Sequence, residues 1–401
     1  MTTKPNTTQN GPIEARLKNT AAAFAYKSDG ELRKAAWLFG QMKRKWLVDI
    51  GSKLTLWTIR IPFVQWIVKN TVFDHFCGGT TLSNAAQKIN KLGDFEVDTI
   101  LDYGAEGKET AEDFNLTMEE NLRAISFAAN NPHISVVSTK VTGMAPFSLL
   151  EAIQQGKTLS EEDQLAYQSV IKRLDTICSL AHQHNIAIYI DAEESWIQSA
   201  IDQLVILMMQ RYNKEKAIVF NTFQMYRHDR LQFLKDTYQQ AQRDGYVLGA
   251  KLVRGAYMDK ERERAAQMGY PSPINPDKAA TDQSFNAAVR FCLEHYQTMA
   301  VANASHNEFS NALQAQLMEE NNIPRNHPNI SFCQLYGMSD HITFNLAQDG
   351  FNVAKYMPYG PVRDVIPYLI RRAQENTSVT GEVGRELDLI SAEVQRRRRS
   401  A

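Results

Sequence analysis

The stretch IAIYIDAE (186–193), followed after a helix-length segment by AIVFNTFQ (217–224), decides the fold class of this 401-residue chain. Both runs are short and rich in β-branched and aromatic residues, which is typical of strands buried on both faces. The segment between them is long enough for one crossover helix, and this spacing predicts two parallel strands. We therefore expect an α/β protein with a parallel sheet.

The same unit recurs along the chain and predicts eight strands. The apolar runs are VDTILDYG (97–104), ISVVSTKVTG (134–143), IAIYIDAE (186–193), AIVFNTFQ (217–224), YVLGAKLVRGAY (246–257), MAVANASHN (299–307), ISFCQLYGM (330–338) and FNVAKYMPYG (351–360). Eight repeats favour a closed (β/α)8 TIM-like barrel, although open doubly wound sheets use the same alternation. No GxGxxG follows the first run and no GxxxxGK[ST] occurs, so neither a Rossmann dinucleotide site nor a P-loop is expected.

Three regions are expected along the chain. Residues 1–95 show helical periodicity without a clear strand, so we expect a helical N-terminal region. The barrel should span residues 96–377, and residues 378–401 should form a tail that ends in the basic run QRRRRSA. Such a tail is usually a disordered end, although its positive charge also suits an anionic membrane surface.

An apolar stretch at 54–73 is interrupted by charged and proline residues too early to span a bilayer. Within it, Phe63, Trp66 and Ile67 recur at helical spacing. We expect this helix to pack against the main domain, and a position at a membrane surface is the alternative.

Composition narrows the function classes. Lys and Arg (44) nearly balance Asp and Glu (45), which disfavours binding to nucleic acid. The four cysteines are scattered without a CxxC, so neither a metal site nor a disulfide framework is predicted. The polar N-terminus lacks the order of a secretory signal and has few arginines for a mitochondrial presequence, so we expect a cytoplasmic protein.

Polar residues near the ends of the predicted strands are candidates for a site, because a parallel barrel gathers its reactive groups at the C-terminal ends of its strands. Each of them alone fits a strand-end residue that reaches solvent. Lys140, Asp191 and Arg254 together favour a site for a charged ligand, since buried charges need partners. The full set is Asp102, Lys140, Asp191, Gln224, Arg254, His306, Gln334 and Tyr356.

The segment YLIRRAQEN (368–376) follows the eighth strand and has helical periodicity. Arg371, Arg372 and Glu375 share one helix face, and by pattern alone this is a solvated face with an i, i+4 ion pair. The functional alternative is that the two adjacent guanidinium groups form a clamp for a carboxylate.

Four motifs in this order resemble those of the proline dehydrogenase family: AKLVRGAY (250–257), SHN (305–307), YMPYGP (356–361) and YLIRRAQEN (368–376). The resemblance covers about residues 97–377. It implies a distorted (β/α)8 barrel that binds FAD and oxidises L-proline to 1-pyrroline-5-carboxylate, with hydride transfer to flavin N5 and electrons passed to a quinone. Because no transmembrane helix is predicted, we expect peripheral association with the inner membrane, with the helix at 54–73 or the basic tail as the attachment candidates.

The resemblance also assigns roles to individual residues. Arg371 and Arg372 would bind the proline carboxylate with Lys140 nearby, and Glu375 would order the arginines and hold the amine region. The residues implied around the proline ring are Asp191, Tyr257, Leu335 and Tyr356. Those implied to contact FAD are Asn221, Gln224, Lys251, Arg254, Ser305, His306 and Asn307.

Two alternatives and one departure accompany the resemblance. Bifunctional members read RLVKGAY, so Lys251 and Arg254 have exchanged types here, which leaves open which of them faces flavin N5 and favours the monofunctional branch. A hydroxyproline dehydrogenase on the same scaffold is the nearest rival, but Tyr356 favours proline because the rival tends to have a smaller residue there. The alternative of another class is a barrel that has lost catalysis and serves as a binding protein.

Overall fold

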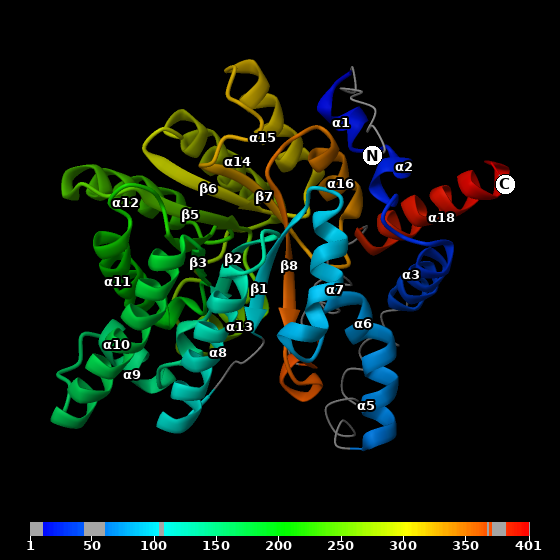
Figure 1. The fold of residues 1–401 in the computed structure, drawn as a ribbon. Coiled ribbons are helices and arrows are strands. Elements are labelled where there is room, and N and C mark those ends of the chain that lie inside the picture. Colours follow the sequence, from blue (N-terminus) through cyan, green and yellow to red (C-terminus); the bar gives the residue numbers. More distant parts are fainter. Residues whose placement is uncertain (1–10, 44–60, 104–107, 367–368, 371–381, 401) are drawn as a thin grey trace.

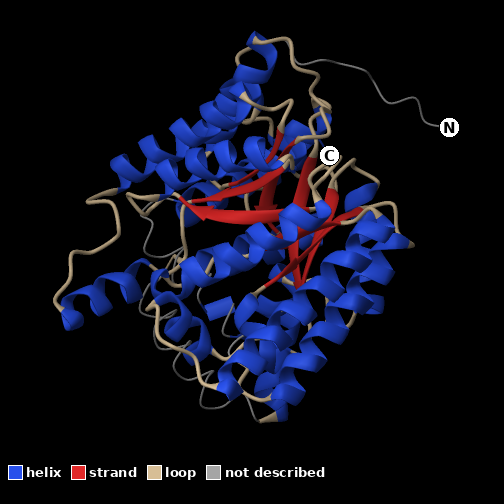
Figure 2. Ribbon diagram, turned by 90° about the vertical axis from the view of Figure 1, so that its left-hand side faces the viewer, coloured by secondary structure: helices blue, strands red, loops and turns tan. Residues whose placement is uncertain are grey.

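A computed structural model describes residues 11–43, 61–103, 108–366, 369–370 and 382–400. Its centre is a closed barrel of eight parallel strands, each paired with its neighbours in chain order, and β8 closes onto β1 (Figures 1 and 2). The strands are β1 (Asp98–Tyr103), β2 (Ile134–Thr139), β3 (Ala187–Ile190), β4 (Val219–Gln224), β5 (Leu248–Val253), β6 (Met299–Ala304), β7 (Ile330–Leu335) and β8 (Val353–Tyr359). The predicted (β/α)8 barrel is confirmed, and each strand lies within its predicted run.

Alternation along the strands separates two layers of the core. Side chains such as Ile100, Tyr189 and Phe220 form a cluster that fills the barrel. Their neighbours along the chain, such as Leu101 and Val219, belong to the larger cluster between strands and helices. A residue's parity within its strand therefore decides whether its side chain faces the barrel interior.

Helices surround the barrel (Figure 2). A helix with a side-chain cap illustrates how sequence sets the bounds: Ser160 accepts from the backbone of Asp163 at one end of α10, and Asn185 ends it in the left-handed conformation. The helices after β1 are α8 (Ala111–Ala129), η2 (Val141–Gly143), α9 (Phe147–Gln154), α10 (Glu161–His184), α11 (Ser195–Tyr212), α12 (Arg230–Asp244), α13 (Met258–Met268), α14 (Lys278–Glu294), α15 (Glu308–Glu320) and α16 (Asp340–Gln348).

The regular secondary structure of the described residues before β1 is helical, apart from one isolated bridge. The bridge joins Gly79 to Tyr359 at the end of β8. The helices are α1 (Ile13–Arg16), α2 (Thr20–Ala23), α3 (Asp29–Met42), α5 (Pro62–Val68), η1 (Lys69–Phe73), α6 (Asp74–Phe76) and α7 (Leu82–Gly93). Buried charge ties this region to the barrel, because the Lys27 ammonium lies 2.7 Å and the fully buried Lys355 ammonium 2.9 Å from the Asp340 carboxylate.

The C-terminal residues differ from the expected disordered tail. Residues Glu382–Ser400 form helix α18, which lies beside α3 (Figure 1). Ile390 is buried in a cluster with Phe39 of α3. Arg397 donates to the carbonyls of Phe24 and Lys27 and pairs with Glu393, so part of the basic run serves the fold. The expectation missed the contacts with Phe39 and with the carbonyls of Phe24 and Lys27 because these residues lie more than 300 positions away in sequence.

The helix at 62–68 does not pack as we expected. Phe63 of α5 is 68% exposed and Trp66 is 62% exposed, and their rings stack on one another with centroids 6.4 Å apart. The prediction that this face packs against the main domain is therefore wrong. None of the helices in the described ranges is both long enough and apolar enough to cross a membrane.

Candidate active site

A buried cluster centred on Asp191 lies at the C-terminal ends of the strands, which we call the barrel mouth. Asp191 follows β3, and its carboxylate accepts hydrogen bonds from Lys140 Nζ (2.9 Å) and Lys251 Nζ (2.6 Å). Ser138 Oγ (3.0 Å) and the Tyr356 hydroxyl (2.9 Å) donate to the same carboxylate. Polar side chains on or directly after β2, β5 and β8 thus converge on one carboxylate directly after β3.

The two lysines keep Asp191 ionised. Burial alone would raise the pKa of this carboxyl, but the charges of Lys140 and Lys251 and their hydrogen bonds hold it well below its ordinary value. Burial raises the pKa of the Tyr356 hydroxyl well above its ordinary value, and the charges of Asp102 and Asp191 act in the same direction. The site therefore presents a fixed carboxylate and a protonated tyrosine at neutral pH.

A second buried carboxyl, Glu193, lies behind this cluster. It accepts hydrogen bonds from the backbone nitrogen of Thr142 (3.0 Å) and from the Thr142 hydroxyl. Burial raises the pKa of Glu193 to about 7, despite these hydrogen bonds and the charge of Lys140. Gln224 of β4 donates to the Glu193 carbonyl (2.7 Å), which places this predicted flavin contact beside the cluster.

Arg254 organises a second group of predicted residues. Its guanidinium donates to Ser305 Oγ (2.6 Å) and Ser310 Oγ (3.0 Å) and pairs with Asp282 at 2.7 Å. Lys251, three residues earlier, instead faces the barrel interior at Asp191. The two positions whose residue types are exchanged therefore serve different parts of the mouth.

The loop after β6 carries the other predicted residues of this group. Asn307 caps α15, since its side chain accepts from the backbone of Ser310 (3.0 Å). Ser305 accepts from the backbone nitrogen of Asn307 (3.1 Å). His306 Nδ1 lies 2.8 Å from the Ser339 hydroxyl of the loop after β7.

The remaining predicted residues are more dispersed. Tyr257 is buried just before α13, and Leu335 is half-buried against the interior cluster. Asn221 has the opposite strand parity from Gln224, and its side chain donates to Asp202 of α11 (2.9 Å). The structure therefore separates Asn221 from the other predicted residues, and its role as a flavin contact stays a prediction.

The predicted carboxylate clamp cannot be placed here. Arg371, Arg372 and Glu375 lie outside the described residues. Within the described part of the mouth, the two lysines of the cluster are accompanied by the buried carboxyls of Asp191 and Asp102.

Three residues at the mouth were not predicted as site residues. Ser138 could have been found by strand periodicity, because it lies two residues before Lys140 and shares its face. Glu193 similarly lies two residues after Asp191. Ser339 has no comparable pattern, because its contact with His306 depends on how two loops approach each other.

The donors around Arg254 suit the phosphates of a flavin cofactor. The Arg254 side chain is 22% exposed and lies beside the Ser305 hydroxyl at the beginning of α15. A cation next to a helix N-terminus is a common environment for phosphate. Lys251 and Gln224 face the barrel instead, where a ring system could contact them. The residues present therefore fit a cofactor that combines a pyrophosphate with a ring.

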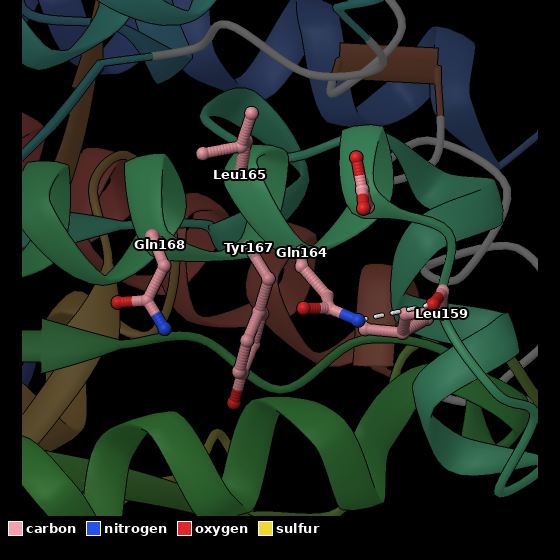
Figure 3. Close-up of a pocket in the computed structure, with 6 residues that line it drawn as sticks. Leu159, Gln164, Leu165, Tyr167 and Gln168 are labelled. Carbon is pink, nitrogen blue, oxygen red and sulfur yellow. Dashed lines mark hydrogen bonds between the residues drawn. The ribbon is translucent and has the colours of Figure 1, made fainter.

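A surface hollow elsewhere does not include these residues. It has a volume of about 420 Å³ and is lined by α10 and the loop before it, including Leu159, Leu165 and Tyr167 (Figure 3). None of its lining residues is a predicted site residue.

Comparison with known proteins gives a consistent family. The family model described as "Proline dehydrogenase" matches residues 85–385. "Proline dehydrogenase 1, mitochondrial" from Dictyostelium discoideum is 31% identical, with 98% of this chain and 76% of that protein covered. The human protein of the same name is 40% identical over 60% of this chain and 41% of its own length.

A solved structure is similar in fold. The crystal structure of proline utilization A (PutA) from Bdellovibrio bacteriovorus, inactivated by N-propargylglycine, superposes with a TM-score of 0.76 at 20% identity. The superposition covers 92% of this chain and 42% of the PutA chain. The matched segments thus cover less than half the length of the human protein and of PutA.

Proposed function

Because this chain belongs to the proline dehydrogenase family, we propose that the Asp191 cluster is part of the site at which it oxidises L-proline with FAD. The product is 1-pyrroline-5-carboxylate. The observation that carries the proposal is the convergence of Lys140, Lys251 and Tyr356 on one buried carboxylate at the barrel mouth. In barrel enzymes this face holds the active site.

The cluster orients the substrate rather than accepting its proton. Asp191 is a weak base at neutral pH, because its pKa is held well below its ordinary value. Its carboxylate holds Lys140, Lys251 and the Tyr356 hydroxyl in fixed positions. In this proposal Tyr356 and Leu335 border the proline ring, and Tyr257 lies at its edge. The carboxylate of proline binds Arg371 and Arg372 with Lys140 nearby, and Glu375 orders this pair.

Removal of the amine proton falls to another group. Glu193 has a pKa of about 7, but its two carboxylate oxygens are directed at the backbone nitrogen and the hydroxyl of Thr142 rather than at the Asp191 cluster. Glu375 or a water molecule therefore remains as the acceptor of this proton.

The cofactor residues divide between its two ends. Arg254, Ser305, His306 and Asn307 hold the phosphate end, and Lys251 and Gln224 hold the ring end. When bound, FAD supplies the acceptor for the hydride from proline C5. The residues of the chain fix the distance and orientation at which that transfer occurs.

A quinone is the proposed electron acceptor. Helix α5 is the proposed contact with the cytoplasmic face of the inner membrane. Phe63 and Trp66 are exposed, and exposed aromatic residues favour the membrane interface. The chain after α5 leads to the mouth, since Gly78 N donates to Pro358 O of β8 (2.8 Å). A membrane contact at α5 therefore supports delivery of a quinone to the barrel mouth.

Anaerobic mixing of the purified protein with L-proline, followed at the flavin absorbance band, tests the proposal. Bleaching by proline that is abolished in Arg371→Met is the expected result. Bleaching by hydroxyproline alone would favour the sister activity, and a protein that neither retains nor binds FAD would contradict the proposal. Reoxidation by a quinone analogue under the same conditions tests the acceptor.

A further inference from the structure

Helix α18 contacts two loops at the barrel mouth through adjacent residues. The carboxylate of Glu386 accepts a hydrogen bond from the backbone nitrogen of Ser339, in the loop after β7. Glu386 is 6% exposed and Ser339 is 4% exposed, so this contact is shielded from water. Arg385 pairs with Glu308, the first residue of α15 and the neighbour of Asn307.

Ser339 transmits the contact to the predicted flavin loop. Its φ of +51° is left-handed, which is uncommon for a residue with a side chain and persists only where the surroundings hold it. Ser339 precedes α16, but its side chain does not cap that helix. The hydroxyl lies instead 2.8 Å from His306 Nδ1. Glu386 therefore fixes the backbone that aims this hydroxyl at His306.

The same loop is held from two directions. Arg254 of the barrel donates to Ser305 Oγ (2.6 Å). From the other side, Glu308 Oε1 lies 2.6 Å from His341 Nε2, and His341 Nδ1 lies 4.0 Å from Glu386. Burial alone would raise the pKa of Glu308, but His341 and Arg385 lower it overall, so Glu308 stays ionised for these contacts.

We propose that Glu386 is a positioning residue for FAD binding, acting through Ser339 on His306. The proposal rests on the proposed function, because it takes residues 305–307 as part of the flavin site. Docking of α18 makes the cofactor loop rigid before the cofactor arrives, which lowers the entropic cost of binding. Helix α18 is thus an integral part of the cofactor site rather than a peripheral tail.

Four variants of the full chain test the proposal by titration with FAD. Glu386→Ala removes the carboxylate that accepts the hydrogen bond from the Ser339 backbone nitrogen. Ser339→Gly removes the hydroxyl, and glycine adopts the left-handed backbone readily. Both should raise the dissociation constant for FAD roughly tenfold. Glu386→Gln keeps an acceptor oxygen, and Asp388→Asn changes an exposed carboxylate on the same helix. These two should change the constant by less than about twofold.

Hydrogen exchange of the cofactor-free chain gives a readout that does not depend on activity. Glu386→Ala should speed exchange of the peptide at 303–311, whereas Asp388→Asn should not. If wild type binds FAD but Glu386→Ala and Ser339→Gly bind it equally well, the positioning role is overturned while the proposed function stands. If wild type binds no FAD, the proposed function fails and the exchange result still decides whether α18 orders the loop. Should Glu386→Ala not fold, equal affinities of Ser339→Gly and wild type would overturn the role.

Discussion

Asp191 accepts hydrogen bonds from four side chains, so its carboxylate cannot be lost without leaving buried cations behind. We expect Asp191→Asn to lower the free energy of unfolding by about 3–5 kcal/mol, as for other broken buried ion pairs. Proline oxidation should fall as well, since Lys140 and Tyr356 lose the carboxylate that positions them. Urea denaturation and proline-dependent flavin bleaching measure the two effects.

The control is an exposed ion pair of the same type. Asp175 pairs with Arg211 at 2.7 Å, but their side chains are 37% and 44% exposed. Asp175→Asn should therefore cost less than about 1 kcal/mol. Because the pKa of Asp191 is lowered in the folded state, its contribution is complete above the ordinary value of 3.8 and is lost as the pH falls through the lowered value. A stability difference that widened in acid would contradict this assignment.

Glu193 predicts the opposite dependence on pH. Its pKa rises from 4.5 to about 7 on folding, so the folded state binds the extra proton and stability falls as the pH rises through this window. We expect the loss to be roughly 3 kcal/mol at most, and Glu193→Gln should remove it. The measurement is the free energy of unfolding of wild type and Glu193→Gln at pH 5 and at pH 7.5. An equal change between the two pH values in both proteins would refute the raised pKa.

Residue types at the site were predictable only where one strand or one motif carried them. The parity of Lys140 and Ser138 follows from the alternation within β2, and the parity of Asn221 could have set it apart from Gln224. The contact of Ser339 with His306 was not predictable, because it joins two loops whose approach depends on the whole barrel.

At the scale of elements, the strands were the most predictable part. Each is a short apolar run buried on both faces, and the segments between them are long enough for a helix. Periodicity identified the helix at 62–68 but did not show what its apolar face contacts, because an apolar stripe has the same pattern whether protein or membrane covers it. Helix α18 was missed because basic composition outweighed its buried face, which includes Ile390 and Glu393.

Helix α5 leads to a test of membrane contact. Replacing Phe63 and Trp66 by Ser should weaken binding to anionic vesicles by roughly tenfold per residue, because each exposed ring would bury apolar area in the interface. Stability should change little, since both side chains are exposed. Co-sedimentation with vesicles measures the binding.

Leu165 offers a matched control for this test. It is 70% exposed on α10, at the hollow of Figure 3. Leu165→Ser removes an exposed apolar side chain of a different helix and should leave vesicle binding unchanged. Equal losses in both variants would show that general surface hydrophobicity, rather than α5, drives the association.

At the scale of the molecule, α18 and the N-terminal helices share one hydrophobic cluster. Ile390 is 1% exposed within it, so Ile390→Ala should lower the free energy of unfolding by about 2–5 kcal/mol. Asp388→Ala on the exposed side of the same helix should change it by less than about 0.5 kcal/mol. Urea denaturation compares the two, and equal effects would mean that α18 does not contribute through packing.

The packing of α18 on α3 also bears on the order of events during synthesis. Arg397 bonds to the carbonyl of Phe24, 373 positions earlier in the chain, and β8 pairs with β1. A nascent chain that still lacks these late segments has its early helices made but not yet covered. We expect a ribosome-stalled chain ending at 381 to be cut by protease between residues 29 and 42, and release of a chain that includes residues 382–400 to protect that segment. Residues 382–400 must therefore leave the ribosome before the helix at 29–42 is covered, which makes this protein a candidate for chaperone assistance during translation.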